Sequence, residues 1–515
     1  MTNPSAPPSR TTDYLLLGAT FFIAVSGLVY ELIAGAASSY LLGDSVYHFS
    51  LVIGLFMTAM GIGAYLSRFV GSPERGFVIS QIMLGLIGGF SAPILFAAFA
   101  LLENYSAFLY LICLSVGVLI GVEIPLIIRI LEGRDALKVT ISNVLTADYI
   151  GALAAALLFP LILVPHLGLM GASLLFGGLN LVVAAMAAWL FRAHLRWPVY
   201  LCLIGALIAV AVGFMRSEQM LTTMERNLYA NEIVLAKQSA YQRIVVTRDD
   251  GRTQLFLNGS IQFDSLDEYR YHESLVHPVM VRAPRLENVI IFGGGDGMAA
   301  REVLRYAEVK EITLVDLDPE VTSLFRDDAQ LAALNDRALS DPRVTIVNAD
   351  AWEYIKGDAG RYDVAILDLP DPKDLAVSKL YSRAFYADLV NVLGAGGLLV
   401  TQATSPVYAR RAYWTIAATL EATEDRYAEN ATLQTLPYHA YVPSFGEWGF
   451  IMAGGRLAQE PIRELPDGLT YFAEGEPDGL FSFPPDMARE TLDPNTLFDH
   501  PLPRLYQEGW SRWYR

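Results

Sequence analysis

The sequence contains only two cysteines in 515 residues, Cys113 and Cys202, and both lie inside long apolar runs. A disulfide framework or a cysteine-ligated metal site needs several cysteines at suitable spacings. This scarcity therefore excludes a disulfide framework and a cysteine metal cluster and gives no sign of a catalytic thiol. We expect no metal site.

The C-terminal part lacks an excess of positive charge. The part of the chain up to Arg216 carries nine Lys and Arg and nine Asp and Glu, so the net charge of −17 belongs entirely to the part that follows. An acidic domain is a poor partner for the phosphates of nucleic acid, and we expect no nucleic-acid binding. It suits a cationic small molecule.

The part up to Arg216 has few polar stretches, and the mean hydropathy of the whole chain is +0.36. Seven apolar runs are each long enough to cross about 30 Å of hydrocarbon as a helix. They cover residues 14–40, 46–67, 77–102, 105–128, 142–165, 169–191 and 197–215. The sequence predicts an all-α transmembrane bundle over residues 1–216 and a polar connector over 217–231.

Three carboxylates, Glu31, Glu123 and Asp148, lie inside these runs or at their ends. A charged side chain in a bilayer costs a few kcal/mol unless it is paired or wetted, so such residues often mark a site. One interpretation is helix packing with Arg129 or Arg68 as partners. The other is an acidic cavity that binds, conducts or presents an amine.

Glycine and proline in the apolar runs bear on how the helices pack. Gly61-Ile62-Gly63 is interpreted as a turn, and Pro125 follows Glu123 closely. Both features predict a kinked and closely packed bundle.

The remaining sequence changes to strand patterns. Short strands near 233–236, 243–247 and 253–257, with a hairpin turn at Asp249-Asp250-Gly251-Arg252, predict a small β domain over 232–287. From 288 to 455, strands alternate with helices, which predicts a Rossmann-like, doubly wound parallel α/β domain. Residues 456–515 are interpreted as an irregular extension. The expected strands of the α/β domain are 289–292, 312–315, 344–347, 364–367 and 398–401.

A glycine-rich turn, Gly293-Gly294-Gly295-Asp296-Gly297, follows the first of these strands, and a helix is expected over 298–306. It departs from the dinucleotide pattern G-x-G-x-x-G, because Met298 occupies the place of the last glycine. Asp296 would repel a pyrophosphate and attract a cation. The turn therefore favours an S-adenosyl donor over NAD.

Four acids fall at the carboxyl ends of parallel strands, where ligands bind in such sheets: Asp296, Asp316, Asp350 and Asp368. Asp316 follows the glycine turn at a spacing of roughly 20 residues, which suits a contact with both ribose hydroxyls. Asp350 suits either an adenine amino group or a helix cap. Asp318, before Pro319, is interpreted as an N-cap.

The segment Asp368-Leu369-Pro370-Asp371-Pro372 places two carboxylates three residues apart between prolines. An Asx-Pro turn is the structural alternative. Alkyl transfer from a sulfonium to an amine requires a neutral amine, whereas alkylamines have a pKa of about 10. One carboxylate can accept the proton while the other holds the far end of a diamine.

These motifs together resemble the spermidine synthases, the polyamine aminopropyltransferases, over residues 232–455, with a membrane domain fused in front as in some members. The resemblance implies aminopropyl transfer from decarboxylated S-adenosylmethionine to putrescine, without a permanently bound cofactor. The motifs that carry it are Tyr241-Gln242, Asp267-Glu268-Tyr269-x-Tyr271-His272-Glu273, the glycine turn and Asp368-x-x-Asp371-Pro372.

The resemblance also implies individual roles. Asp368 would be the proton acceptor. Amine groups would be held by Tyr271, His272, Asp296 and Asp371. The adenosine of the donor would lie against Gln242, Gly293, Gly295, Asp316, Asp350 and Ala351.

Three departures from the family pattern concern the pocket. Asp316 stands where Glu is common, and Leu369-Pro370 stands where small polar residues are common. Phe445 occupies a stretch in which a Pro-Thr-Tyr sequence shapes the amine pocket of soluble members, and it has no hydroxyl. The alternatives are therefore transfer to another amine or an aminolipid, or a polyamine transporter or sensor with a ligand-binding domain of this kind.

The expected location of the protein follows from the apolar N-terminal part and the acidic C-terminal part of the sequence. We expect a multi-pass protein of the cell (inner) membrane and, because soluble relatives form dimers or tetramers, a homo-oligomer. Basic residues lie in the N-terminal tail and in alternate loops, which predicts that this side of the membrane is cytoplasmic. Seven crossings would then place the catalytic domain on the opposite side. An adenosylated donor is made in the cytoplasm, which favours a cytoplasmic catalytic domain instead.

Overall fold

The computed structural model describes residues 10–42, 45–101, 105–132, 137–217, 219–220, 223, 229–357, 360–427 and 431–513. Most of the predicted connector lies outside these residues. The chain divides into two compact units, Met1–Ala240 and Tyr241–Arg515. Further division into a small β domain, an α/β domain and an extension stays a prediction.

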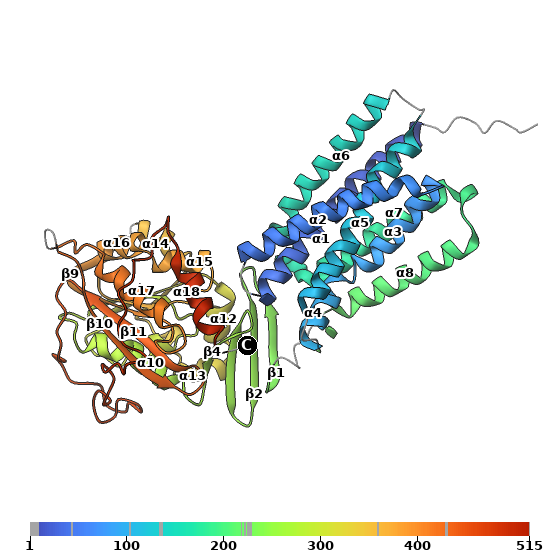
Figure 1. The fold of residues 1–515 in the computed structure, drawn as a ribbon. Coiled ribbons are helices and arrows are strands. Elements are labelled where there is room, and N and C mark those ends of the chain that lie inside the picture. The colour runs from blue at the N-terminus through green and yellow to red at the C-terminus, as the bar shows by residue number, and fades with distance from the viewer. Residues whose placement is uncertain are drawn as a thin grey trace, which may run out of the picture. The chain divides into compact units, whose positions relative to one another are not determined.

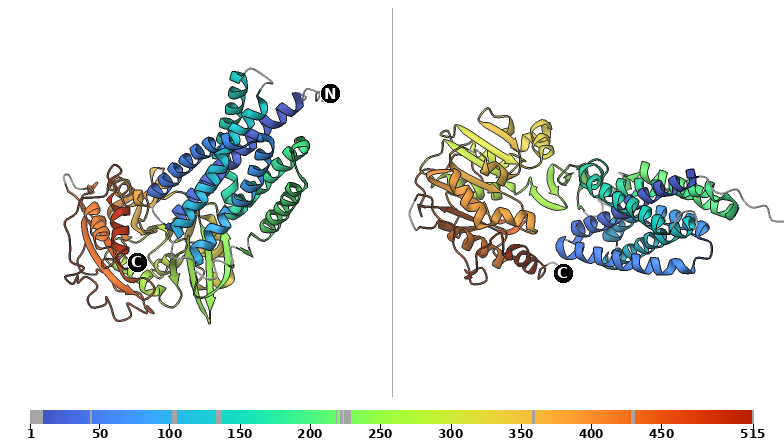
Figure 2. Two further views of the ribbon diagram at one scale, coloured as in Figure 1. Left: turned by 45° about the vertical axis from the view of Figure 1, so that its right-hand side comes forward. Right: turned by 90° about the horizontal axis from the view of Figure 1, so that it is seen from above.

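The first unit is helical (Figure 1). Its helices pack against one another in several pairs, including α1 with α6, α2 with α5, and α3 with α7 (Figure 2). The helices are α1 (Arg10–Leu42), α2 (Ser45–Leu66), α3 (Pro73–Ile87), α4 (Ser91–Leu101), α5 (Tyr105–Leu131), α6 (Leu137–Leu158), α7 (Val164–Leu190) and α8 (Trp197–Met215). Shorter elements are η1 (Ser67–Phe69), η2 (Phe159–Leu163), η3 (Arg192–His194) and the strand β1 (Glu232–Gln238).

Six described stretches are long and apolar enough to cross a membrane. The fifth, Leu137–Leu190, has 54 residues, which as one helix would measure about 80 Å. Gly168 interrupts it with φ 63° and ψ 179°, at the point where the sequence separates two runs. The predicted run 77–102 likewise forms two helices, α3 and α4. The number of crossings stays a prediction, and the helices fit a membrane-associated chain.

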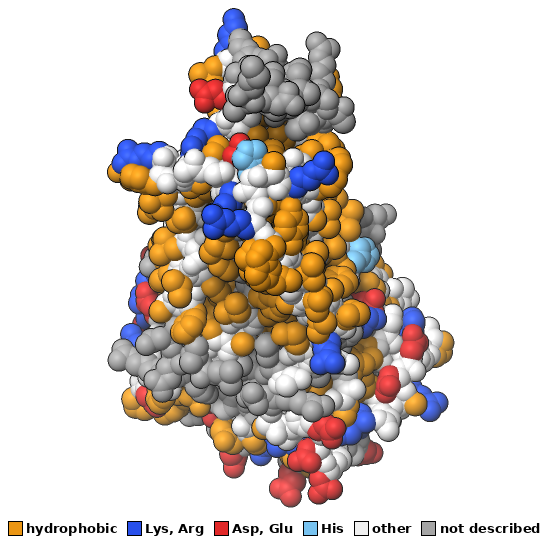
Figure 3. Space-filling model, turned by 90° about the vertical axis from the view of Figure 1, so that its right-hand side faces the viewer, with side chains coloured by type: hydrophobic (Ala, Val, Ile, Leu, Met, Phe, Trp, Pro, Cys, Tyr) orange, Lys and Arg blue, Asp and Glu red, His pale blue; other side chains and the backbone are white. Residues whose placement is uncertain are grey.

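Hydrophobic side chains predominate on the face of the bundle shown in Figure 3. Exposed apolar residues on α7 and α8 include Trp189, Leu201 and Ile208. A soluble monomer seldom exposes so much contiguous apolar surface, and a bilayer would cover it.

Close helix contact in the bundle depends on glycine. A Cβ added to Gly63 of α2 would lie 2.1 Å from the carbonyl oxygen of Val118, and one on Gly121 of α5 would lie 2.1 Å from that of Met60. Tight packing is thus confirmed. The predicted turn at Gly61-Ile62-Gly63 is wrong, because these residues belong to α2: the surrounding apolar residues continue the helix, and Gly63 provides the contact with α5.

Polar side chains connect helices in the described interior of the bundle. Glu123 of α5 is fully buried and accepts a hydrogen bond from Gln81 of α3, and Asn180 donates to the Tyr30 hydroxyl over 2.8 Å. The predicted alternative, pairing with Arg129 or Arg68, is wrong. Arg129 donates to the carbonyls of Ser67 and Val70, and the Arg68 guanidinium lies over the Tyr65 ring. Glu31 and Asp148 are only partly buried.

The second unit contains two sheets. In the smaller, β2 (Arg243–Asp249), β3 (Arg252–Leu257) and β4 (Ser260–Asp264) form an antiparallel meander, and Asp249 pairs with Arg252 across the predicted hairpin turn. Asp250 and Gly251 both have positive φ, as a two-residue hairpin turn requires.

The larger sheet has seven strands in the order β10-β11-β9-β8-β5-β6-β7. Its strands are β5 (Asn288–Gly293), β6 (Glu311–Asp316), β7 (Val344–Asn348), β8 (Tyr362–Asp368), β9 (Leu393–Gln402), β10 (Gln434–Val442) and β11 (Gly446–Gly454). The first five are mutually parallel. The five predicted strands are parallel, as expected, whereas β10 and β11 were not predicted and add an antiparallel hairpin on β9, so the sheet as a whole is mixed. The connection between β10 and β11, residues 443–445, is too short for a parallel crossover.

The helices of this unit follow the strands. They are α10 (Glu268–Met280), α11 (Met298–Val303), α12 (Pro319–Asp327), α13 (Ala329–Leu334), α14 (Ala351–Lys356), α15 (Leu375–Ser378), α16 (Arg383–Val392), α17 (Arg410–Glu421) and α18 (Pro501–Trp510), with the 3₁₀ turns η4 (Ala338–Ser340) and η5 (Lys379–Tyr381). Helix α11 is shorter than the predicted 298–306. Helix α18 lies in the extension that was expected to be irregular.

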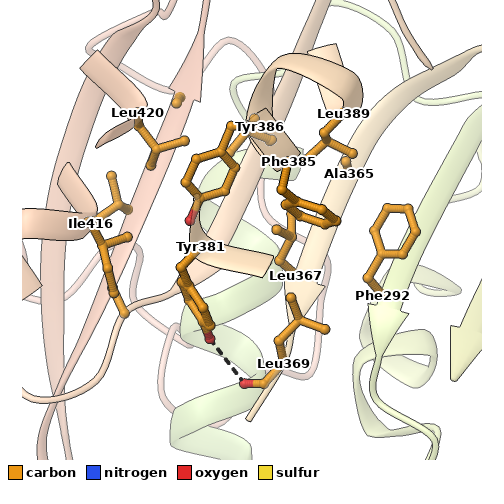
Figure 4. Packing of buried hydrophobic residues seen from close by; sticks show 14 of the residues in the cluster. Phe292, Ala365, Leu367, Leu369, Tyr381, Phe385, Tyr386, Leu389, Ile416 and Leu420 are labelled. Atoms are coloured by element: carbon orange, nitrogen blue, oxygen red, sulfur yellow. Dashed lines mark hydrogen bonds between the residues drawn. The ribbon is translucent and has the colours of Figure 1, made fainter. Parts of the chain in front are cut away.

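The core packs side chains of β5, β8 and β9 against α16 and α17, as Figure 4 shows for part of it. Phe292, Leu367 and Phe385 are fully buried there. The Tyr381 hydroxyl donates to the carbonyl of Leu369 over 3.3 Å. The core thereby holds the chain that continues beyond β8.

Candidate active site

The glycine turn begins where β5 ends. Gly293, Gly294 and Gly297 have φ of 78°, 63° and 79°, which favour glycine. A Cβ on Gly293 would lie 2.0 Å from the carbonyl oxygen of Asp368. The turn therefore brings two strand ends within contact distance.

Asp316, at the end of β6, is hydrogen-bonded to the turn. Its carboxylate accepts from the backbone N–H of Gly295 over 3.1 Å and from that of Asp318 over 2.8 Å. Burial raises the pKa of Asp316 to about 6 against these hydrogen bonds. Asp316 therefore lies against the glycine turn, and its contact with ribose hydroxyls stays a prediction.

Asp318 is an N-cap, as predicted, since it accepts from the N–H of Glu320. Its second oxygen accepts from the Gln242 side-chain amide over 3.0 Å. This contact holds Gln242 at the wall of the cavity that Asp316 also lines.

Asp350 caps α14 by accepting from the N–H groups of Trp352 and Glu353, so the cap interpretation is confirmed. Its other oxygen lies 3.0 Å from the Lys379 ammonium. Burial would raise the pKa of Asp350, but Lys379 and the cap hydrogen bonds lower it. This carboxylate is therefore ionised and already paired.

The acid pair lies at the end of β8, where Asp368 is the last residue of the strand and Asp371 follows it. The Tyr271 hydroxyl donates to Asp368 over 2.7 Å, and the Gln402 amide donates to Asp371 over 3.3 Å. Burial raises the pKa of both acids to about 6, opposed by the charge of His272 at Asp368 and by hydrogen bonds at Asp371. Each acid is thus ionised at neutral pH and close to the range in which it can take up a proton.

His272 is part of a row of interacting charged side chains. Its Nδ1 lies 2.8 Å from Glu268, which also forms two 2.9 Å contacts with Arg301. Burial disfavours the protonated ring, but Glu268, Asp296 and Asp368 raise the pKa of His272 to about 9. An imidazolium donates hydrogen bonds and does not accept one from an ammonium. His272 is thus suited to balancing the neighbouring carboxylates, which differs from the amine contact that the resemblance implies.

Asp296 is buried inside the glycine turn. Its carboxylate accepts from the N–H of Met298 over 3.0 Å, and the Asn335 amide donates to its carbonyl over 2.7 Å. Burial raises the pKa of Asp296, and the charge of His272 opposes this shift.

One cavity of about 430 Å³ brings these groups together. All the site residues that the sequence predicts in this unit line it, from Gln242 to Asp371. They are Gln242, Tyr271, His272, Gly293, Gly295, Asp296, Asp316, Asp350, Ala351, Asp368 and Asp371. The volume and the excess of carboxylates suit an extended, positively charged ligand.

Several residues of the cavity were not predicted from the sequence. Gln402, Lys379 and Tyr506 line the cavity and contact its acids. Gln402 ends β9, so the rule that ligands meet strand ends could have found it. Tyr506 lies in the extension, where nothing in the sequence links it to Asp371.

Glu273 of the motif and the nearby His277 of α10 support the structure of the unit. Glu273 accepts from the N–H groups of Thr470, Tyr471 and Phe472, and so ties the extension to α10. His277 lies between Tyr306 and Glu302 in the interior.

The chain is similar to known proteins over nearly its whole length. Residues 268–459 match the model of the spermine/spermidine synthase domain. Polyamine aminopropyltransferase 1 of Ralstonia nicotianae is 45% identical, over 98% of this chain and 97% of that protein. A polyamine aminopropyltransferase of Leptospira interrogans is 40% identical, over 95% and 97%. A solved spermidine synthase in complex with the transition-state analogue AdoDATO matches 49% of this chain and 86% of its own at 26% identity, with a TM-score of 0.44.

Proposed function

We propose that the chain, which belongs to the polyamine aminopropyltransferase family and is an aminopropyltransferase, moves the propylamine group of decarboxylated S-adenosylmethionine to putrescine. The products are spermidine and methylthioadenosine. The observation that carries the proposal is the cavity, where eleven residues from distant parts of the sequence meet.

The donor is assigned to the glycine-turn side. Asp316 would take the ribose hydroxyls, with Gln242 beside it and the backbone of Gly293 and Gly295 against the nucleoside. Asp350 and Ala351, at the start of α14, would border the adenine. Since Lys379 already pairs with Asp350, an adenine amino group would share that carboxylate.

Asp296 accounts for the choice of donor. Its carboxylate, buried in the turn, would attract the ammonium of a propylamine group. The same charge would repel the carboxylate of intact S-adenosylmethionine, which selects the decarboxylated form.

The transfer needs a neutral amine. The nitrogen lone pair attacks the propyl carbon bonded to sulfur, the C–S bond breaks, and its electron pair stays on the sulfur of methylthioadenosine. The nitrogen gives its proton to Asp368, which Tyr271 holds by a 2.7 Å hydrogen bond. Asp371 would pair with the far ammonium of the acceptor.

Mass spectrometry of the reaction products tests this proposal. The full-length protein in detergent is given the decarboxylated donor with putrescine, and separately with cadaverine, spermidine or membrane lipid. We expect methylthioadenosine and spermidine in equal amounts with putrescine. Product with another amine only would reject putrescine, and donor binding without any product would favour the transporter or sensor alternative.

One observation favours a different acceptor as the second candidate. The centroid of the Phe445 ring lies 5.8 Å from that of the Tyr271 ring, beside the acid pair. Phenylalanine offers no hydrogen bond to an amine. A longer polyamine or an aminolipid would place methylene groups there.

Activity should depend on pH through the acid pair. We expect kcat at saturating substrates to fall as the pH drops through about 6, because burial raises the pKa of Asp368 to about 6 and the protonated acid cannot accept a proton. Above that pH the base is ionised and the rate should level off. A pH–rate profile from 5 to 8 measures this, and a flat profile would contradict the role of Asp368.

For the membrane part, we propose a multi-pass inner-membrane protein whose catalytic unit faces the cytoplasm, where the donor is made, and which forms at least a dimer. The intramembrane site would be centred on Glu123, with Glu31 and Asp148 near it. Fluorescence from a C-terminal fusion that folds only in the cytoplasm tests the orientation, and its absence would place the catalytic unit outside. Chemical cross-linking tests the oligomer.

A further inference from the structure

Helix α18 brings a tyrosine into the cavity from outside the matched domain. The synthase-domain match ends at residue 459, whereas Tyr506 lies in the extension and lines the cavity. Asp371 lines the same cavity, and the Tyr506 hydroxyl interacts with its carboxylate and lowers its pKa. The extension therefore contributes directly to the acid pair.

The position of Tyr506 is set by the packing of its helix. Leu502 and Leu505 are buried in the core of the second unit. A Cβ on Gly509 would lie 2.6 Å from the carbonyl oxygen of Tyr408, so α18 and the start of α17 approach each other closely. The Trp510 and Tyr408 rings are 4.8 Å apart. Helix α18 is thus a fixed part of the cavity wall.

An aromatic wall continues from this helix to the reacting end. Ring centroids are separated by 6.5 Å from Trp510 to Trp448, 5.2 Å from Trp448 to Phe445, and 5.8 Å from Phe445 to Tyr271. The Tyr271 hydroxyl donates to Asp368 at one end of the wall, and Tyr506 lines the cavity with Asp371 and lowers the pKa of that acid. Each acid of the pair thus has its own tyrosine.

We propose that Tyr506 is a positioning and specificity-determining residue for the amine acceptor. It holds the Asp371 carboxylate toward the far ammonium and closes that end of the cavity, where Phe445 has no hydroxyl to offer. A closed end limits the length of chain that can bind between the two acids. The inference rests on the proposed function only in that the acceptor is an amine lying between Asp368 and Asp371.

The test compares Tyr506→Phe and Tyr506→Ala with wild type in the full-length protein, using putrescine, cadaverine and spermidine. A hydrogen bond to a charged group is worth roughly tenfold or more in binding, so Tyr506→Phe should raise the acceptor KM about tenfold and leave the donor KM unchanged. Tyr506→Ala should also raise kcat/KM for the longest amine relative to putrescine about tenfold, because space opens behind Asp371. The control is Tyr441→Phe, which removes a hydroxyl from an exposed ring of the same unit.

A pH measurement separates positioning from general support. The Tyr506 hydroxyl lowers the pKa of Asp371, so the loss of the hydroxyl should raise that pKa. As the pH falls, the acceptor KM should therefore begin to rise at a higher pH in Tyr506→Phe than in wild type. If Tyr506 had a merely structural role, Tyr506→Phe would lower the melting temperature without shifting the pH at which the acceptor KM begins to rise.

The outcomes separate the two proposals. If wild type uses a different amine, putrescine is rejected, and the Tyr506 comparison is read from the ratios among the amines that are used. The role of Tyr506 is overturned, whatever the substrate, if both variants keep the wild-type acceptor KM, the same ratios of kcat/KM among the amines, and the same pH at which the acceptor KM begins to rise. A rise in donor KM equal to that in acceptor KM overturns it as well.

Discussion

Asp368→Asn should lower kcat about a thousandfold, since general-base catalysis contributes roughly 10² to 10⁴ in rate. Asparagine keeps the shape of the side chain and can still contact the Tyr271 hydroxyl, which donates to Asp368 over 2.7 Å. It cannot accept the proton that the amine must lose. Methylthioadenosine formation with saturating donor and putrescine measures the effect.

Binding has to be separated from chemistry in this variant. The affinity for methylthioadenosine should stay close to that of wild type, because Asp316 and the glycine turn, to which the nucleoside is assigned, are unchanged. Asp327→Asn is the control, since it removes an exposed carboxylate of the same unit that pairs with the neighbouring Arg326. Turnover of Asp368→Asn near the wild-type rate would mean that another group takes the proton.

Gly293→Ala should abolish most activity and lower the melting temperature. The added Cβ would lie 2.0 Å from the carbonyl oxygen of Asp368, a backbone atom that cannot rotate away, and φ at this position is 78°. Relief of the contact requires β5 and β8 to separate at the site, which displaces the base. We expect turnover to fall at least about a hundredfold, as a misplacement of about 1 Å can do.

Gly251→Ala is a matched control. Its φ of 86° imposes a similar backbone cost of about 1–2 kcal/mol, but its Cβ would meet nothing within 4 Å. Thermal unfolding and turnover of both variants, in the same detergent, isolate the contribution of the close approach. Equal melting temperatures and equal activity in the two variants would show that the strand ends do not need this contact.

The fold class was predictable from patterns of short range. Long apolar runs specify helices, and alternating strands and helices specify an α/β sheet, because burial and backbone hydrogen bonding act on every residue in the same way. The antiparallel β10 and β11 were not predicted as strands, because Pro437 in β10 and Gly449 in β11 weaken the pattern of a strand. Gly61-Ile62-Gly63 was misjudged because a glycine that breaks a helix in water can serve as its contact face in an apolar bundle.

Within the site, the sequence alone determined the four strand-end acids and the glycine turn, because parallel strands place their carboxyl ends at one edge. Only the tertiary structure decided that Tyr271 and Tyr506 each reach one acid of the pair, that Lys379 occupies Asp350, and that Gln81 is the partner of Glu123. The two partners of each pair belong to different elements and lie far apart in the sequence. Their contacts depend on how whole elements pack, which no local pattern of residues specifies.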